Sequence, residues 1–274
     1  MPYQTRVDRN RPACLVVLID QSFSMSEPHA GNQAQSKAAA LATAVNDLLY
    51  ELVIRSVKDP SEGPRHYYDV AIVGYGADVG SAWSGPLSGR DLVSIVDIAN
   101  NPTIMSERDD GSRFPVWVEP STNGPTPMSG AIDHAGRIVA EWIAEHSDSF
   151  PPIVVNISDG AATDGDPSVW ADRLRSLSTE DGAALFFNVN FSNSSGEPVW
   201  FPDSAGGLPN DYAISMFDIS SPLPGFMQEL AAMEGHAVAP GSRGFVFNAD
   251  ITSVVGFLQI GTATQHVSGD LGGA

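Results

Sequence analysis

Oxygen-bearing side chains stand at alternate positions directly after the apolar run Leu15–Ile19: Asp20, Ser22, Ser24 and Ser26. A carboxylate is a hard anion and a hydroxyl is a neutral, weak ligand. This mixture suits an ion that prefers oxygen, such as Mg²⁺, Mn²⁺ or Ca²⁺, and does not suit zinc. Alternate residues of an extended turn point to the same side, so these oxygens can face one ion. Capping of the next helix is the alternative, because Ser and Asp are also preferred N-cap residues.

Two later segments carry side chains that can reach the same place. Asp159 ends the apolar run Pro151–Ser158, and a loop rich in Gly and Asp follows it. Thr126 lies in the segment NGPTPMSGAI, directly before a predicted helix. Ligands of open parallel sheets bind outside the carboxyl ends of the strands. We therefore expect Asp20, Thr126 and Asp159 to approach one crevice.

The elements that position these residues alternate between strands and helices. Continuous apolar runs predict buried strands, and apolar residues repeating at i, i+3 and i+4 predict helices. The predicted strands are 13–20, 67–76, 151–160 and 183–191, with a short antiparallel edge strand at 81–85 and further strands at 213–220 and 244–250. The predicted helices are 35–57, 89–99, 128–146, 167–178, 225–234 and 251–260. This alternation predicts an α/β fold, a doubly wound, mostly parallel sheet with helices on both faces.

The predicted domain organisation is simple. We expect an N-terminal segment at 1–12 and one domain at 13–262, followed by a flexible tail at 263–274. Polar and Gly/Pro-rich stretches predict insertions at about 86–125 and 192–211. Trp117 and Trp200 fall in these insertions, where an exposed aromatic side chain could contact a partner.

The composition excludes several classes of protein. Of 274 residues, 42% are hydrophobic, and the net charge is −19. Nucleic acid and anionic membranes need a basic footprint, so neither is expected as the main partner. The acidic balance suits a cation or a basic protein partner, and a surface that keeps the protein soluble explains it equally well. Cys14 is the only cysteine, which excludes an internal disulfide framework and a thiolate metal site. The N-terminus has no apolar leader, and no apolar run is long enough to span a bilayer, so a cytoplasmic location is predicted.

Three separated motifs resemble the metal-ion-dependent adhesion site (MIDAS) of von Willebrand factor A (VWA) domains. They are D-x-S-x-S at 20–24, G-x-T-x-M-S-G-A around Thr126, and I-S-D-G-x-x-T-D around Asp159. The last two look most like the bacterial tellurite-resistance (TerY-type) subgroup. The resemblance covers about residues 13–191 and implies a Rossmann-like fold with one divalent cation, most simply Mg²⁺, at its top.

The resemblance also implies roles for individual residues. Ser22, Ser24 and Thr126 would be direct metal ligands, and Asp20 and Asp159 would act directly or through water. A protein partner would supply a carboxylate to the open coordination position, and the TerY resemblance suggests a kinase or phosphatase of a bacterial stress-response system. These implications describe a binding module without catalysis.

One position departs from the family pattern. The family usually has glycine between the two serines, and this chain has Phe23. Phenylalanine does not tolerate backbone angles that only glycine adopts. Either the loop has a different shape, or Phe23 packs over the site or against a partner.

The alternative is a Mg²⁺-dependent phosphohydrolase of the haloacid-dehalogenase type, with Asp20 as nucleophile. Such enzymes need a second carboxylate two residues later as general acid, and Ser22 stands there. A hydroxyl cannot do this work near neutral pH. The chain has two lysines, Lys37 and Lys58, and neither has an obvious place beside a phosphoryl group. A sheet with capped loops and no metal is the third hypothesis.

Other polar residues admit simpler explanations. The six histidines show no metal-ligand spacing, although His29 follows the first motif closely enough to edge the site. Asp164 and Asp166 could tune a metal or hold a second ion, but aspartates in a Gly-containing loop are usually turn residues.

Overall fold

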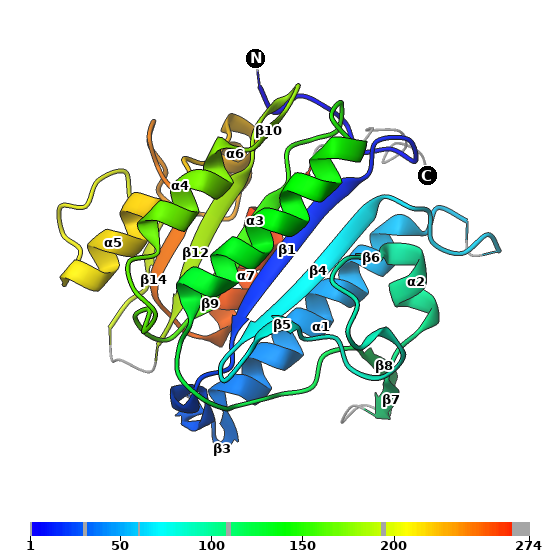
Figure 1. The fold of residues 1–274 in the computed structure, drawn as a ribbon, viewed down its shortest axis with the longest axis horizontal. Helices are drawn as coiled ribbons and strands as arrows, with labels where there is room; N and C mark the ends of the chain where they lie inside the picture. Colours follow the sequence, from blue (N-terminus) through cyan, green and yellow to red (C-terminus); the bar gives the residue numbers. More distant parts are fainter. Residues whose placement is uncertain (1, 30–31, 60, 108–110, 193–195, 265–274) are drawn as a thin grey trace.

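A mostly parallel β-sheet runs through the computed structural model of this protein, which describes residues 2–29, 32–59, 61–107, 111–192 and 196–264. In these residues the sheet has eight strands, in the order β13-β14-β12-β9-β1-β4-β5, with β6 also paired to β4 (Figure 1). The parallel strands are β1 (Ala13–Asp20), β4 (Tyr68–Tyr75), β9 (Ile153–Ser158), β12 (Leu185–Phe191) and β14 (Phe245–Ala249). The antiparallel edge strands are β5 (Val79–Ser81), β6 (Val93–Ser94) and β13 (Val199–Trp200).

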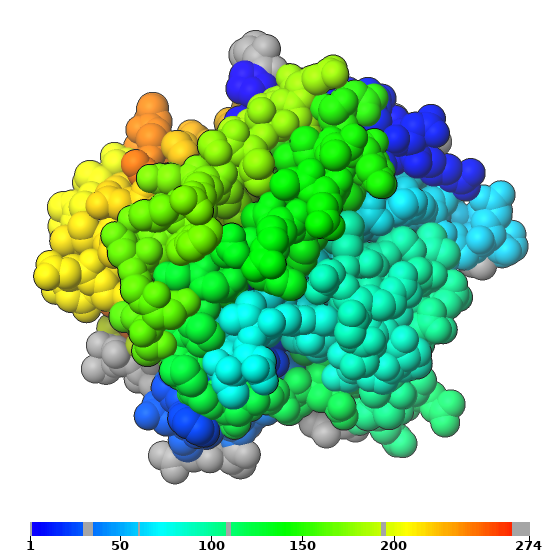
Figure 2. Space-filling model, viewed as in Figure 1, coloured from blue at the N-terminus to red at the C-terminus, as the bar shows by residue number. Residues whose placement is uncertain are grey.

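Helices cover both faces of this sheet. One core cluster contains residues of α1, α2, α6 and α7, and the other contains residues of α3, α4 and α5. Figure 1 shows α3 and α4 crossing the front of the sheet, and Figure 2 shows how they conceal it. The bounds are α1 Lys37–Ser56, α2 Ile95–Asn100, α3 Met128–Glu145, α4 Ser168–Ser176, α5 Asp211–Ile219, α6 Gly225–Met233 and α7 Ile251–Gly261. The predicted fold class is therefore confirmed.

The apolar runs of the sequence form the strands because both faces of the sheet are buried. Every residue of β1 is buried. Its odd-numbered residues Leu15, Val17 and Ile19 pack into one core cluster, and the even-numbered residues between them pack into the other. A strand of this kind reads as a continuous apolar run and not as an alternating one.

Several short elements lie outside the sheet. They are the 3₁₀ turns η1 (Phe23–Ser26) and η2 (Gly85–Leu87) and the paired strands β2 (Pro28–His29) with β3 (Asn32–Ser36), β7 (Ile104–Glu107) with β8 (Arg113–Val116), and β10 (Ser178–Thr179) with β11 (Gly182–Ala183). The first predicted insertion therefore contains a hairpin, and the second contributes the edge strand β13.

One predicted strand is wrong. Residues 213–220 belong mostly to α5, which begins after Asn210. The Asn210 side chain accepts a hydrogen bond from the backbone N–H of Ala213 at 2.8 Å and thereby caps the helix. Ala213, Met216 and Phe217 are buried at helical spacing. The predicted antiparallel edge strand exists, but it ends at Ser81 instead of beginning there.

The strand order defines where a ligand can bind. The chain passes from β1 to β4 on one side of β1 and later returns to β9 on its other side. Such a reversal opens a crevice at the carboxyl ends of the two neighbouring strands. Asp20 ends β1, and Asp159 follows β9 directly.

Two further points concern the described residues. None of their helices is long and apolar enough to cross a membrane. Most of the predicted tail, residues 265–274, lies outside them.

Candidate metal centre

Asp20 is buried at the end of β1 with both carboxylate oxygens engaged. Its Oδ1 accepts the backbone N–H of Ser22 at 2.8 Å, and its Oδ2 accepts the hydroxyl of Ser158 at 2.7 Å. Burial raises the pKa of Asp20, and these hydrogen bonds offset part of that rise. Asp20 therefore shapes the turn after β1 and joins it to the end of β9.

Three oxygens converge beyond Asp20. Ser22 Oγ and Ser24 Oγ are 3.0 Å apart, and Ser24 Oγ donates a hydrogen bond to Asp159 Oδ1 at 2.7 Å. Ser24 and Asp159 are 135 residues apart in the chain. The structure thus brings together three of the five predicted metal-site residues through direct side-chain contacts.

These separations fit a small oxygen-coordinated ion. Mg²⁺ takes octahedral ligands at about 2.1 Å, so neighbouring ligand oxygens lie about 3.0 Å apart. The distances of 3.0 Å between the two serine hydroxyls and 2.7 Å from Ser24 to Asp159 are close to that edge. The donor set consists of oxygen only, which agrees with a hard cation.

The Thr126 loop is held between the other two loops by backbone contacts. Gly124 O accepts the N–H of Phe23 at 3.0 Å, and Gln21 O accepts the N–H of Asn123 at 2.6 Å. On its other side, the N–H of Thr126 donates to Thr163 Oγ1 at 3.0 Å, just beyond Asp159. All three predicted motifs are therefore joined at the lower end of the sheet in Figure 1.

Thr126 itself is placed less directly. Thr126 is buried, and its hydroxyl has no hydrogen bond to any residue that the structure describes. Its position follows from Gly124, which has φ of +71° and lies so close to Ala77 that a Cβ would be 2.4 Å from the Ala77 nitrogen. This hydroxyl is therefore uncommitted, on a loop whose backbone contacts the other two motifs.

Lys37 is a residue of this site that sequence reasoning missed. Its ammonium group donates to Asp159 Oδ2 and to Glu27 Oε2, each at 2.9 Å. Burial alone would lower the pKa of Lys37, but the two carboxylates outweigh burial and raise it, so the side chain stays charged. Asp159 is 122 residues away in the sequence, and no local pattern signals this pairing.

Phe23 stands at the position where the motif that this sequence resembles usually has glycine. It begins the 3₁₀ turn η1 and does not have a positive φ, so the backbone needs no glycine at this position. The residue is 68% exposed, so its side chain does not pack over the site. It stands in solvent between the two serines.

The two later aspartates act as helix caps. Asp164 accepts the backbone N–H groups of Ser129 and Gly130 at 3.1 and 2.8 Å, in the first turn of α3. Asp166 accepts the N–H of Ser168 at 2.9 Å, at the start of α4. These contacts satisfy helix N–H groups that lack partners within the helix.

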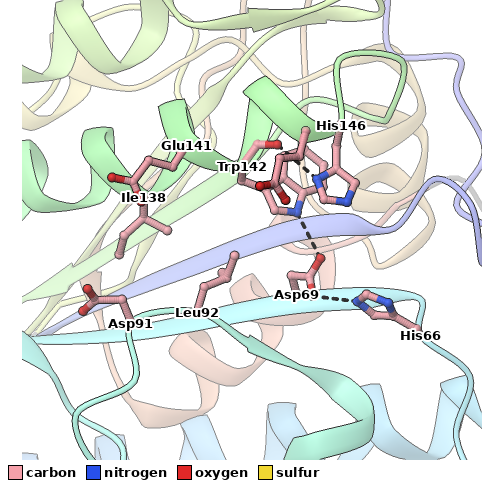
Figure 3. Close-up of a pocket in the computed structure, with 9 residues that line it drawn as sticks. His66, Asp69, Asp91, Leu92, Ile138, Glu141, Trp142 and His146 are labelled. Carbon is pink, nitrogen blue, oxygen red and sulfur yellow. Dashed lines mark hydrogen bonds and ion pairs between the residues drawn. The ribbon is translucent and has the colours of Figure 1, made fainter.

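A separate cavity of about 450 Å³ lies between the C-terminal half of α3 and the start of β4 (Figure 3). Asp69 contacts His66 Nε2 at 2.6 Å and accepts the Trp142 Nε1–H at 3.0 Å. In the parallel register of β1 and β4, Asp69 lies opposite Cys14, which is six residues before Asp20. This cavity is therefore about 20 Å from the serine hydroxyls. Within the described residues, no three His, Cys, Asp or Glu side chains are grouped to hold a metal, in this cavity or elsewhere.

Two aromatic predictions had different outcomes. Trp117 is buried and donates its indole N–H to Ile98 O at 2.6 Å, so the idea that it contacts a partner is wrong. Trp200 is half-buried and stacks on His236 with ring centres 4.0 Å apart.

His29 is buried, and its Nε2 lies 3.3 Å from Gln35 Oε1.

Comparisons with known proteins show a likeness of fold. A scan of family models and a search of curated proteins find no match to the sequence. The structure is similar to proximal thread matrix protein 1 from the mussel byssus, with a TM-score of 0.50 and 14% identity, over 93% of this chain and 48% of that one. The chain therefore spans about half the length of the mussel protein. A second structure of that protein has a zinc-occupied MIDAS motif (TM-score 0.45, 17% identity, 80% and 43% coverage).

Two further structures are similar at lower scores. Manganese-loaded TRAP protein of Plasmodium vivax has a TM-score of 0.47 at 11% identity, over 93% of this chain and 75% of that one. A von Willebrand factor type A structure from Catenulispora acidiphila has a TM-score of 0.39 at 15% identity, over 65% and 33%. Identities this low show the fold alone, and scores below 0.5 add nothing to it.

Proposed function

We propose that this chain is a divalent-cation-dependent protein-interaction module of the MIDAS type. The observation that carries the proposal is the convergence of Ser22, Ser24 and Asp159 at separations of 3.0 and 2.7 Å, outside the carboxyl ends of β1 and β9. Hydroxyls supply most of the donors, so the chain adds little negative charge to a bound ion. An ion held in this way retains affinity for an external anion.

Each residue has a role in this proposal. The hydroxyls of Ser22, Ser24 and Thr126 would hold the cation directly, with Asp159 beside them. Asp20 is buried and already accepts two hydrogen bonds, so it orients the serine turn and acts on the ion through water. The bound cation would supply a Lewis-acidic position for a carboxylate of the partner protein.

The surroundings of the site also suit a protein partner. Phe23 is exposed between two of the proposed ligands and offers an apolar contact next to the acidic group of the partner. Aromatic side chains of this kind often contribute strongly to binding when a partner covers them. We propose Mg²⁺ as the ion, with Mn²⁺ and Ca²⁺ as alternatives, because the spacing of the oxygens matches a small octahedral ion.

The finer assignments rest on the sequence. We propose one domain over 13–262 and a bacterial, cytoplasmic, tellurite-resistance-like assembly, with a kinase or phosphatase as partner. None of the similar structures named above supports that narrower context. The motifs around Thr126 and Asp159 are the basis for the tellurite-resistance-like context.

The proposal is tested by binding measurements. Mn²⁺ is titrated by calorimetry into the wild type, Thr126→Ala and, as a matched control, Thr43→Ala, whose hydroxyl bonds to Ala39 O on the exposed side of α1. One ion per chain is expected for the wild type and the control, with binding weakened at least about tenfold by Thr126→Ala. Pull-down in Mn²⁺ and in EDTA then shows whether a partner depends on the same residue. Equal Mn²⁺ affinity of all three proteins would contradict the proposal.

A Mg²⁺-dependent phosphohydrolase is the alternative. Lys37 lies beside Asp159 and removes one objection to it, because such enzymes use a lysine near the phosphoryl group. Asp20, however, would be the nucleophile, and it is buried with both oxygens occupied. Turnover of p-nitrophenyl phosphate with Mg²⁺ that disappears in Asp20→Asn would favour the enzyme.

A further inference from the structure

Lys37 is a buried cation at the edge of the proposed metal site. Its side chain is 6% exposed, and that of Asp159 is 3% exposed. Glu27, the second carboxylate on the same ammonium group, is 62% exposed. Lys37 therefore connects the interior of the site with its solvent-exposed rim.

The position of Lys37 in its own helix does not favour a positive charge. Lys37 is the first residue of α1, where the positive end of the helix dipole opposes cations. The first turn of α1 contains no acidic residue that would compensate. The favourable interactions of this ammonium group come from outside the helix, and Asp159 is the buried one.

The two oxygens of Asp159 face different partners. Oδ1 accepts the Ser24 hydroxyl at 2.7 Å, and Oδ2 accepts the Lys37 ammonium group at 2.9 Å. A divalent ion among the hydroxyls would share this one carboxylate with Lys37. Two cations on one buried carboxylate repel each other, and each reduces the negative charge that the other meets.

We propose that Lys37 is a built-in counter-cation that balances Asp159 in the metal-free protein and weakens the binding of a divalent ion. This inference rests on the proposed metal site. The charge of Lys37 keeps the Asp159 carboxylate compensated when no metal is bound. It also raises the dissociation constant of the divalent ion, because the ion must share the Asp159 carboxylate with the ammonium group.

The first test changes the charge and retains the size of the side chain. Lys37→Met removes the ammonium group and retains an unbranched apolar chain, while Lys37→Arg retains the charge as a control. The repulsion between two cations about 5 Å apart, one of them divalent, lowers the affinity for the divalent ion about tenfold even at the dielectric constant of water. We expect Lys37→Met to bind Mn²⁺ about tenfold more tightly than the wild type, and Lys37→Arg to stay near the wild type.

The second variant has the opposite expected effect. Glu27→Gln removes the exposed partner of Lys37 and leaves the ammonium group to Asp159 alone. Mn²⁺ binding should become weaker, by less than the gain in Lys37→Met, because Glu27 is exposed and screened. A lysine with a purely structural role would not tighten Mn²⁺ binding when its charge is removed.

Thermal melting provides a separate readout. In EDTA, Lys37→Met should melt below the wild type because Asp159 loses its buried partner. Saturating Mn²⁺ should raise its melting temperature more than that of the wild type. Equal or weaker Mn²⁺ binding by Lys37→Met would overturn the inference. If Lys37→Met does not fold, unchanged or tighter binding by Glu27→Gln overturns it. If wild type and Lys37→Met both fail to bind Mn²⁺, the metal site itself is refuted.

Discussion

Asn46 connects α1 to the segment that leads into the Thr126 loop. The residue is buried, and its Oδ1 accepts the backbone N–H groups of Trp117 and Val118 at 2.8 and 3.1 Å. Its Nδ2 donates to Val118 O and Ala42 O, both at 2.8 Å. The substitution Asn46→Ala removes all four contacts at once.

The cost follows from the groups that lose their partner. Three buried backbone groups of Trp117 and Val118 are left without the amide, and each costs about 1–3 kcal/mol when unsatisfied. The Ala42 carbonyl retains its place in the helix, and alanine is the better helix former by about 0.5 kcal/mol. Water entering the vacated space recovers part of the loss. We expect Asn46→Ala to lower the free energy of unfolding by about 3–5 kcal/mol.

Urea unfolding, followed by circular dichroism, measures this change. Asn100→Ala is the matched control, because Asn100 makes the same type of contact, from Nδ2 to Val96 O at 2.8 Å, on the exposed end of α2. The control should change the free energy of unfolding by less than about 0.5 kcal/mol. A loss below about 1 kcal/mol in Asn46→Ala would refute the reasoning.

The remaining predictions concern metal, pH, surface and packing. Mn²⁺ at one hundred times its dissociation constant adds about 2.7 kcal/mol, so differential scanning fluorimetry should show a rise of about 5–10 °C that EDTA reverses and Thr126→Ala diminishes. A hydrogen bond to Asp69 raises the pKa of His66 above 6.5, so its stabilisation is complete below pH 6.5 and disappears as pH rises through the folded pKa. The hydrogen bonds from His66 and Trp142 outweigh burial and lower the pKa of Asp69, so its contribution is lost only in acid below pH 3.8. The urea midpoint of the wild type should therefore decrease as pH rises from 6 to 8, and that of His66→Gln should decrease less. An equal decrease in both proteins would contradict this reasoning. Phe23→Ser should leave the urea midpoint unchanged because the side chain is exposed, and a clear drop would mean that it packs in the fold. In Gly76→Ala, the new Cβ would lie 2.3 Å from Asn123 O, so a loss of about 1–3 kcal/mol is expected in the same assay, and wild-type stability would show that the loop yields freely.

The buried strands and long helices could be predicted from the sequence because burial on both faces leaves a direct signature. β1 and β9 appear as apolar runs with the predicted bounds to within two residues, and α3 ends one residue before its predicted end. Residues 213–220 predict a strand although they lie mostly in α5, because a short, mostly apolar stretch fits either element. The cap at Asn210, which decides the matter, lay outside the run.

The site was predictable in part for a related reason. Asp20, Ser22 and Ser24 are close in the sequence, and the rule for parallel sheets brings Asp159 to them. Lys37 could not be found, because its partner lies across the switch between β1 and β9, and pairings over 122 residues leave no local pattern. The burial of Trp117 depends in the same way on a distant residue, Asn46.

The most direct test of the central claim is the position of a bound ion. Crystals grown with Mn²⁺ give an anomalous difference map that locates the metal without assumptions about its ligands. We predict a single strong peak within bonding distance of the hydroxyls of Ser22, Ser24 and Thr126. A map without a peak there, or with its main peak in the cavity beside Asp69, would contradict the proposed metal centre.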